Sequence, residues 1–343
     1  VSFIQESDNN LGYQVLAKKV VDTTYMQVTI PSMRPPRFQV NDASIIVSPV
    51  NDVPKLVESH PGADFVVAGA GKTGVDAVIE LLRLGIKSSR IVWVIPNDAW
   101  YLVREVLFTP ESFVSEHAEF IDVLLRSNSM EETFLKMESN LNPQVTRLDQ
   151  NILPKKFRGA TISRYSISKL KSINRMIRLG RIVRIENGRM ELERGNIRLT
   201  KDSCVIDCTA DGLPSKDPLP VFCDEKIILQ SIQTFQPTYS AALIAYVEAH
   251  VLNKVTQNDI CSVAAAPVHV EDYTRNLYNH FKVAKALKDH RCMRFVMKSR
   301  LNLACGVSLW RLLWIRFGPS AFPVKVNKFL ERVENGKYKV SVE

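Results

Sequence analysis

The chain has 343 residues, of which 45% are hydrophobic and 24% are charged. Its length is about twice that of a usual domain of roughly 150 residues, and its composition excludes disulfide-stapled peptides, disordered chains, collagens and multispan membrane proteins. Lysine and arginine outnumber aspartate and glutamate by 45 to 36, a net charge of +9, which suits an anionic partner such as a nucleotide, a nucleic acid or a membrane surface.

The N-terminal part of the sequence predicts an extended connection without a core of its own. Residues 1–60 contain several prolines between short β-like runs. Residue 1 is Val, and no basic start followed by an apolar run is present, so the beginning is not typical of a signal peptide.

At residue 65 the pattern changes to strand, tight turn and helix. A continuous apolar run over residues 65–68 is followed by three glycines and by helix-like spacing over 75–84, which Gly85 closes. A second apolar run over 91–95 completes a β-α-β unit, which predicts parallel strands and a right-handed crossover. The predicted fold class is therefore α/β with a parallel, Rossmann-like sheet.

The later segments predict helices and a β-meander. Residues 99–142 are mainly helical in pattern, and residues 159–180 predict a basic helix that ends at glycine. Apolar and polar residues alternate around Asn187-Gly188, the dipeptide that most favours a two-residue hairpin, which predicts the meander. We then expect a buried strand over 204–207 and helices over 240–250 and 271–297.

One motif carries the functional prediction. The run GAGKTG fits the GxGxxG fingerprint of dinucleotide sites, directly after a predicted strand and before a predicted helix. In such a loop the first glycine permits a tight turn, the second lets a diphosphate approach the backbone, and the third lets helix and strand pack closely. The run consists of Gly69, Ala70, Gly71, Lys72, Thr73 and Gly74.

Two other interpretations of this run compete with a dinucleotide site. The letters GKT also occur in P-loops, but GxxxxGK[ST] needs a glycine five positions before Gly71, where the chain has Val66 inside the predicted strand. A glycine turn without a ligand is the second alternative, because a tight strand-to-helix turn needs glycine in any case. The dinucleotide site is the better explanation.

The choice between NAD and NADP should depend on residues after the second strand. An acidic residue there binds a ribose 2′-hydroxyl, whereas an arginine accommodates a 2′-phosphate. Asn97 and Asp98 occupy this position; Asp98 would favour NAD, and Arg90 or Arg104 would favour NADP. The sequence leaves both choices open.

The chain resembles the FAD- and NAD(P)-dependent oxidoreductases related to flavin-containing monooxygenases, over roughly residues 20–250. The resemblance lies in the runs VVAGAGKTGVDAVIELLRLG, IVWVIPNDAW, CVIDCTADGLPSKDPLPVF and QPTYSAALIAYVEAH. It implies an NAD(P)-binding domain over 61–180, inserted into an FAD-binding domain to which 181–343 return and of which 1–60 are a connecting remnant. In that family a reduced nicotinamide passes a hydride to the flavin.

The resemblance also assigns site residues. It gives the glycine run to the NAD(P) phosphates, and it gives the turn after the strand at 204–207 to the flavin, through Thr209, Ala210, Asp211 and Gly212. Relatives often carry an arginine where Asn97 stands, and this difference weakens an assignment to NADP.

The FAD domain of such proteins should begin with its own strand-GxGxxG-helix, and no second GxGxxG occurs in these 343 residues. We therefore expect FAD only if a segment before Val1 supplies that loop, and we expect the chain to be a fragment. Without such a segment, the strand around Val205 is expected to lack parallel neighbours and to expose apolar surface.

The other notable groups predict packing rather than chemistry. The histidines show no HExxH pattern, so we expect no metal site, and the six cysteines contain no CxxC pair, which is typical of free thiols in a reducing compartment such as the cytoplasm. The basic stretches come without a nucleic-acid motif, so no nucleic-acid partner is expected. The run LWRLLWIRF over 309–317 is too short to span a membrane and predicts core packing or a weak membrane-surface contact.

These observations predict an NAD(P)H-dependent, monooxygenase-like flavoprotein oxidoreductase that acts on a small molecule. The alternative is a non-catalytic NAD(P)-binding module that has lost FAD binding.

Overall fold

The computed structural model divides the chain into two compact units. It describes residues 2–4, 12–14, 16–107, 110–210, 212–213, 215–308, 310, 313, 322–336 and 338. Unit 1 comprises Val1–Gln27, Ser215–Ala266 and Arg275–Cys305, and unit 2 comprises Val28–Pro214, Pro267–Thr274 and Gly306–Glu343. The units therefore do not follow the boundaries expected at residues 60 and 180.

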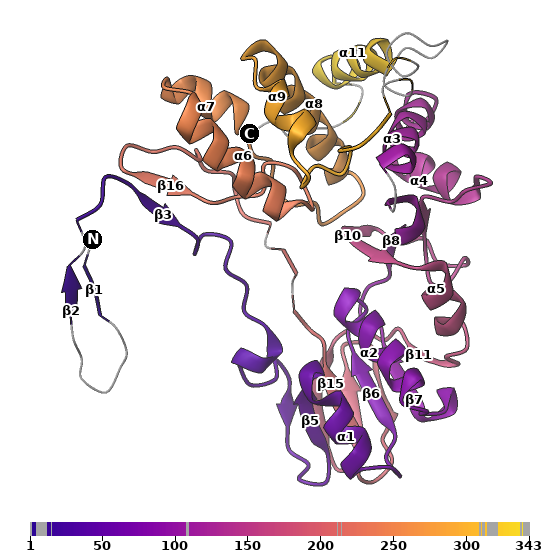
Figure 1. Cartoon of the computed structure of the whole chain (residues 1–343). Helices are drawn as coiled ribbons and strands as arrows, with labels where there is room; N and C mark the ends of the chain where they lie inside the picture. Colours follow the sequence, from indigo (N-terminus) through magenta and orange to yellow (C-terminus); the bar gives the residue numbers. More distant parts are fainter. Residues whose placement is uncertain are drawn as a thin grey trace. The chain divides into compact units, whose positions relative to one another are not determined.

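A five-stranded parallel sheet forms the centre of unit 2, which makes this unit an α/β structure (Figure 1). Its spatial order is β11-β7-β6-β15-β5. The strands are β5 (Ile46–Pro49), β6 (Phe65–Ala68), β7 (Ile91–Val94), β11 (Arg175–Ile177) and β15 (Cys204–Asp207). Every residue of β6, β7 and β15 is buried, because both faces of the sheet are covered; this explains why these strands are continuous apolar runs.

Helices cover one face of this sheet. They are α1 (Val53–Ser59), α2 (Lys72–Arg83) and α5 (Arg164–Leu170), and α1 and α2 lie in front of the strands in Figure 1. Phe65, Ile91 and Trp93 of the sheet share one buried cluster with Leu56 of α1 and Leu81 of α2. The amphipathic pattern of α2 is thus satisfied by the sheet.

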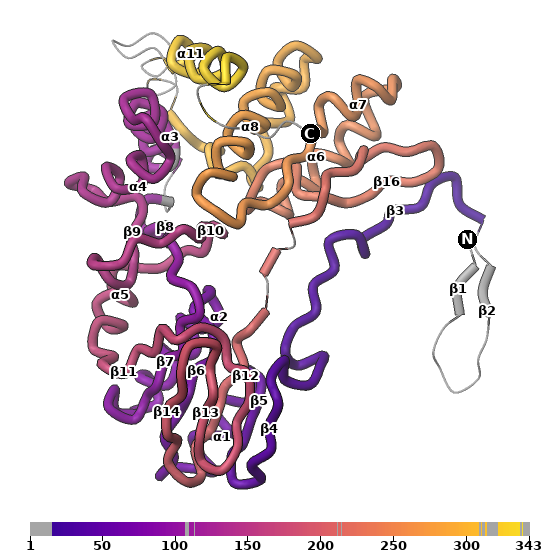
Figure 2. The backbone as a smooth tube through the Cα atoms, turned by 180° about the vertical axis from the view of Figure 1, so that it is seen from behind, coloured from indigo at the N-terminus to yellow at the C-terminus, as the bar shows by residue number. Residues whose placement is uncertain are grey.

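An antiparallel meander covers the other face (Figure 2). It comprises β12 (Ile182–Glu186), β13 (Arg189–Leu192) and β14 (Gly195–Arg198), and β4 (Gln39–Val40) pairs in parallel with β12. Asn187 and Gly188 both have positive φ, 51° and 69°, as a type I′ hairpin turn requires. Met190 packs with Val66 and Val205 of the sheet. The predicted meander and its turn are confirmed.

Unit 2 has a second part, separate from the five-stranded sheet. It contains a small sheet in the order β10-β8-β9 and an aromatic cluster in which Phe134 lies 5.5 Å from Trp100 and 4.9 Å from Phe157, centroid to centroid. The elements are β8 (Ala99–Val103), β9 (Val145–Thr146), β10 (Lys156–Ile162), α3 (Pro110–Leu125), α4 (Met130–Ser139) and α11 (Phe322–Glu334). Short 3-10 turns occur at Pro31–Met33, Val50–Asp52, Ser88–Arg90 and Arg104–Leu107.

Unit 1 is mainly helical. Its core includes Phe222, Leu243, Ile260 and Leu287. The helices are α6 (Pro237–His250), α7 (Lys254–Ile260), α8 (Asp272–Asp289), which begins in unit 2, and α9 (Met293–Lys298). The strands are the parallel pair β3 (Val20–Asp22) and β16 (Lys226–Ile228) and the antiparallel pair β1 (Ser2–Ile4) and β2 (Gly12–Gln14).

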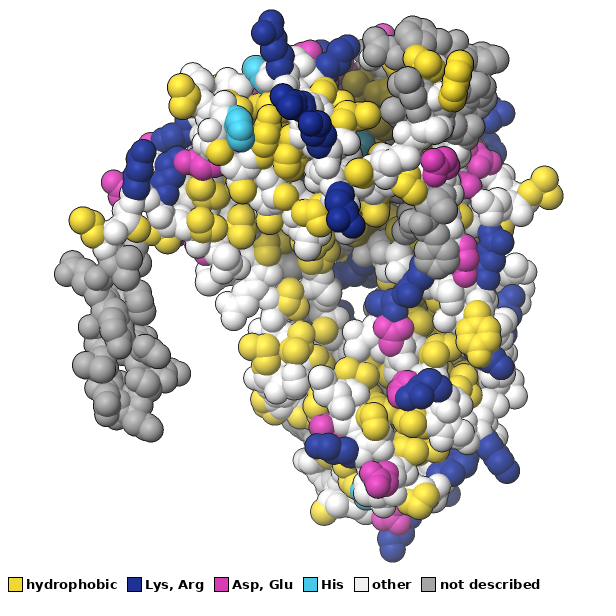
Figure 3. Space-filling model, viewed as in Figure 1, with side chains coloured by type: hydrophobic (Ala, Val, Ile, Leu, Met, Phe, Trp, Pro, Cys, Tyr) yellow, Lys and Arg dark blue, Asp and Glu magenta, His cyan; other side chains and the backbone are white. Residues whose placement is uncertain are grey.

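Lysine and arginine side chains lie next to hydrophobic ones over α8 and α9 in Figure 3. Within the described part of the chain, none of the helices is long and apolar enough to cross a membrane.

The prediction of core packing for the run 309–317 is wrong for Trp310, because this side chain is 83% exposed. Most of the run lies outside the described residues. A weak membrane-surface contact of this run stays a prediction.

Three helix predictions need correction. Residues 159–180 do not form one helix: β10 ends at Ile162, α5 covers Arg164–Leu170 and β11 begins at Arg175. The start of the 99–142 stretch is the strand β8. The helix expected over 271–297 divides into α8 and α9, because Arg291 adopts a positive φ of 61° that helical backbone does not allow.

The expectation for residues 1–60 is also wrong in part. Residues 46–59 form β5 and α1, and Val53 and Leu56 belong to the main core. β5 lies beside β15, so Val205 has parallel neighbours on both sides, β5 and β6, and is fully buried. The chain itself therefore completes the sheet that we expected to be open at this strand.

Candidate functional site

The glycine loop joins the carboxyl end of β6 to the start of α2. Gly69 has a φ of 113°, and a Cβ atom there would lie 2.9 Å from the backbone oxygen of Cys208. A Cβ atom at Gly74 would lie 2.0 Å from the backbone oxygen of Gly69, so the helix and the turn touch directly. Gly71, in contrast, has nothing within 4 Å of its Cβ position. The three glycines therefore have the three different surroundings that a diphosphate-binding turn needs.

Two buried aromatic side chains hold this loop in place. The indole Nε1 of Trp93, in β7, donates to the backbone oxygen of Gly69 at 2.9 Å. The hydroxyl of Tyr101, in β8, donates to the backbone oxygen of Ala70 at 2.5 Å. Both side chains are fully buried. The sequence analysis missed these positioning residues, because each follows an ordinary apolar strand pattern.

The first turn of α2 is open to an anion. Its N-cap is Gly71, which has no side chain to cap the helix, and its first turn holds no acidic residue. The backbone N–H groups of a first helical turn have no partner within the helix, and the helix dipole places positive charge there. Gly71 and Thr73 are exposed, and Lys72 forms an ion pair with Asp76 one turn along the helix. Phosphate oxygens would find free donors at this position.

The loop lies where the order of the sheet reverses. The chain continues from β6 to β7 and β11 on one side, whereas β15 and β5 lie on the other side. All these strands are parallel, so the turns after β6 and β15 lie at the same edge of the sheet. The two turns are in contact there, because the Cβ position of Gly69 lies next to Cys208. Ligands of open α/β sheets bind at such reversals, outside the carboxyl ends of the strands.

The turn after β15 has its own polar network. The carboxylate of Asp207 accepts hydrogen bonds from the backbone N–H of Thr209 at 2.8 Å and from its hydroxyl at 2.6 Å. Arg34 donates to the backbone oxygen of Thr209 at 3.1 Å and lies 3.4 Å from Asp207. Burial raises the pKa of the neighbouring Cys208 thiol to about 12, so this thiol is protonated and unreactive at neutral pH.

The other residues predicted for this turn are less informative. Ala210 is half-buried, and Gly212 is exposed with a φ of 70°. Asp211 lies outside the described residues. The structure therefore places Thr209 in a defined network but gives Ala210 and Gly212 no contact that points to a ligand.

The residues after β7 lie at the same carboxyl edge as the glycine loop. Asn97 is exposed, whereas Asp98 forms an ion pair with Arg178, which follows β11, at 3.0 Å. Arg90 lies at the amino end of β7, 3.9 Å from Asp64. It therefore lies at the opposite edge of the sheet, where it cannot hold a 2′-phosphate next to the loop. Arg104 is exposed in the turn after β8.

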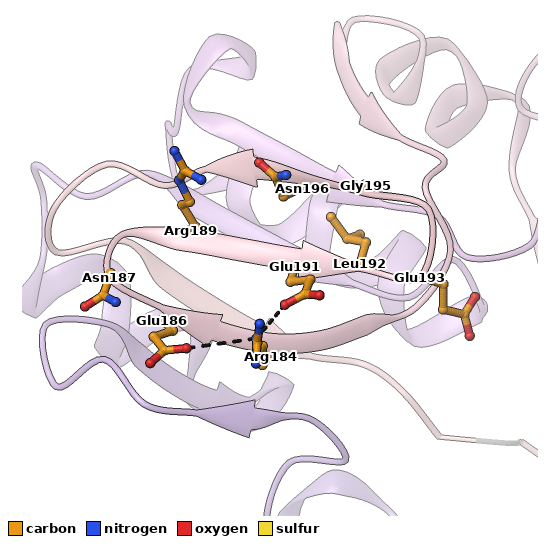
Figure 4. A pocket seen from close by; sticks show the side chains of 9 residues that line it. All are labelled: Arg184, Glu186, Asn187, Arg189, Glu191, Leu192, Glu193, Gly195 and Asn196. Atoms are coloured by element: carbon orange, nitrogen blue, oxygen red, sulfur yellow. Dashed lines mark ion pairs between the residues drawn. The ribbon is translucent and has the colours of Figure 1, made fainter.

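A shallow hollow of about 630 Å³ lies elsewhere, on the meander (Figure 4). In it, Arg184 forms ion pairs with Glu191 and, at 3.9 Å, with Glu186. The hollow does not lie at the strand ends where α/β proteins bind ligands. Its lining residues are Arg184, Glu186, Asn187, Arg189, Glu191, Leu192, Glu193, Gly195 and Asn196. Among the described residues, no cluster of histidine, cysteine and acidic side chains is suited to a metal ion.

Comparisons with known proteins give relatives of undescribed activity. Uncharacterized proteins from two strains of Mycobacterium tuberculosis and from Mycobacterium bovis are each 31% identical to the chain over 291 residues, which are 83% of this chain and 53% of the relative. The chain thus spans about half the length of these relatives. No protein-family model matches the sequence, and no solved structure matches it.

Proposed function

We propose that this protein binds NAD(P)H at the glycine loop after β6 and acts as an oxidoreductase of the flavin-monooxygenase-related type. The observation that carries the proposal is the loop itself: Gly74 packs directly on Gly69, while the space over Gly71 is open beside an uncapped helix N-terminus. A tight turn without a ligand explains the glycines at 69 and 74, but it does not require one at 71.

The order of four of the five strands and the cover on the two faces of the sheet support the same proposal. Taken in chain order from β6, the strands β6, β7, β11 and β15 have the spatial order 3-2-1-4, which is the order of dinucleotide-binding folds. Helices on one face and a meander on the other agree with a Rossmann-like, FAD/NAD(P)-binding fold. A P-loop is disfavoured, because Val66 is fully buried within β6 and cannot belong to a phosphate-binding loop.

In this proposal the chain's own residues bind and orient the nucleotide. The backbone N–H groups of Lys72 and Thr73 would donate to the diphosphate, while two carbonyl oxygens of the loop already accept hydrogen bonds from Trp93 and Tyr101. The nicotinamide, when bound, supplies a hydride for the redox step. The protein supplies position and electrostatic complementarity.

The family resemblance also implies FAD, but the described residues fit FAD less well than they fit NAD(P)H. In unit 1 the described parallel pair, β3 and β16, has three residues in each strand, and neither strand is followed by a glycine loop. We therefore assign no residue of this chain to the FAD phosphates. This observation favours the second candidate function, an NAD(P)-binding module without turnover.

Binding should be tested first, with a matched pair of glycine variants. Gly71→Val places a side chain where the diphosphate would lie, and Gly62→Val makes the same change at another glycine with open space around it. We expect NADH or NADPH to bind the wild-type chain and Gly62→Val alike, and Gly71→Val at least about tenfold more weakly, a loss of about 1.4 kcal/mol. Equal affinity in all three proteins would contradict the proposed site.

A visible spectrum separates the two candidate functions. Purified protein that is incubated with FAD and then separated from unbound FAD should show flavin absorbance that NAD(P)H bleaches in the absence of oxygen, if the protein is an oxidoreductase. A colourless protein that still binds NAD(P)H would support the non-catalytic module instead.

A further inference from the structure

The strand ends beside the glycine loop carry an unbalanced charge cluster. Arg178 contacts Asp98 through two nitrogens: Nε lies 3.0 Å from one carboxylate oxygen, and Nη2 lies 3.2 Å from the other. The same guanidinium lies 3.6 Å from the carboxylate of Asp149. One positive group thus forms ion pairs with two negative groups. The cluster carries a net charge of about −1 when all three groups are ionised.

This cluster lies on the side of the loop where the second strand ends. The backbone N–H of Ile95 donates to the oxygen of Ile177 at 2.8 Å, so the segments that lead to Asp98 and Arg178 run side by side at the carboxyl edge. The Asp98 carboxylate also helps to raise the pKa of Tyr101, whose hydroxyl bonds to Ala70 of the loop. The cluster therefore lies at the same edge of the sheet as the glycine loop.

A nucleotide bound at the loop would bring its adenosine ribose toward the end of the second strand. A ribose 2′-hydroxyl donates a hydrogen bond to a carboxylate, whereas a 2′-phosphate adds a charge of about −1.5 to −2 at neutral pH. Next to Asp98 and Asp149 this charge would be repelled, and the only arginine in contact with these two carboxylates in the described structure is already shared between them. The neighbouring Asn97 is uncharged and offers no compensation.

We propose that the Asp98–Arg178–Asp149 cluster selects NADH over NADPH. The inference rests on the proposed function, because it concerns the same nucleotide at the same loop. It assigns the selection to repulsion of the extra phosphate rather than to a tighter grip on NADH.

The test is the ratio of the dissociation constants for NADPH and NADH, measured by titration of the fluorescence of each nucleotide. We expect the wild-type chain to bind NADH at least about tenfold more tightly. Asp98→Asn and Asp149→Asn should each reduce this ratio, and the double variant, which leaves Arg178 without a carboxylate, should bind NADPH at least as tightly as NADH. Because both dissociation constants are measured on the same protein, a modest loss of stability in a variant does not change their ratio.

Glu191→Gln is the control, because it removes one carboxylate from an ion pair on the meander and keeps the cluster intact. It should leave the ratio unchanged. A wild-type chain that binds NADPH as tightly as NADH would overturn the inference, and so would a ratio that the double variant does not move. Failure of the wild-type chain to bind either nucleotide would instead overturn the proposed function and the inference with it.

Discussion

At position 74 the loop has no room for even one methyl group. The backbone oxygen of Gly69 lies only 2.0 Å from the place where a Cβ atom would be, and the sheet and α2 hold the backbone of both glycines in position. The requirement for glycine at this position comes from packing, whereas at position 71 nothing in the folded chain requires it. The proposed nucleotide would give the second position a reason.

This difference predicts effects of very different size for the same substitution. Gly74→Ala should lower the free energy of unfolding by about 1–3 kcal/mol or more, because backbone must move to admit the methyl group. Gly71→Ala should change it by less than about 0.5 kcal/mol. Urea denaturation of the two variants measures both effects, and similar stabilities would show that the close contact at Gly74 is not as described.

Tyr101→Phe tests the anchoring of the loop. Removing the hydroxyl leaves the buried Ala70 oxygen without its donor, which should cost about 1–3 kcal/mol of stability at pH 7. The fully buried Trp93 would remain as the second anchor, so the variant should fold.

The same tyrosine predicts a pH dependence. Burial, together with the charge of Asp98, raises the pKa of Tyr101 above its ordinary value of about 10, so the folded state keeps the phenol protonated. The stability that this provides is present below pH 10 and is lost as the pH rises above it, because the unfolded chain then ionises first. Tyr101→Phe should therefore lose less stability than the wild-type chain between pH 9 and pH 11 in denaturant titrations; an identical slope would be evidence against a buried, neutral phenol.

Among the elements, the meander shows how far the sequence could predict structure. Alternation and the Asn187-Gly188 turn identify the hairpin, because both features are local. In contrast, residues 159–180 contain a short strand on each side of α5, and the pairing of β11 with β7 depends on residues more than 80 positions away in sequence. Helical spacing over this stretch was a misleading signal, since tertiary pairing overrides local pattern.

The two faces of β13 should respond differently to substitution. Met190 is fully buried against the parallel sheet, and Glu191 faces the hollow on the outer side. Met190→Ala should cost about 2–5 kcal/mol, and Glu191→Ala, which removes only a half-exposed ion pair with Arg184, should cost less than about 1 kcal/mol. Thermal denaturation of both variants checks the expected strand register, since a slip of one residue would exchange the two results.

On the scale of the whole molecule, the division into units could not be predicted from the sequence. Unit 2 takes in β5 and α1 before the glycine loop and a segment after residue 266, and these long-range associations leave no local pattern. The glycine loop was visible in the sequence because its spacing is a short-range signal. Its surroundings, including Trp93, Tyr101, Arg34 and Arg178, were not visible, because the fold brings them together from separate elements.

The most direct measurement of the central claim is amide hydrogen exchange with and without saturating NADH, followed by mass spectrometry. Slower exchange of the backbone amides at 69–76, with unchanged exchange in the meander at 186–196, is the result predicted for a nucleotide held at the end of β6. Unchanged exchange at 69–76, or protection confined to the meander, would contradict the claim.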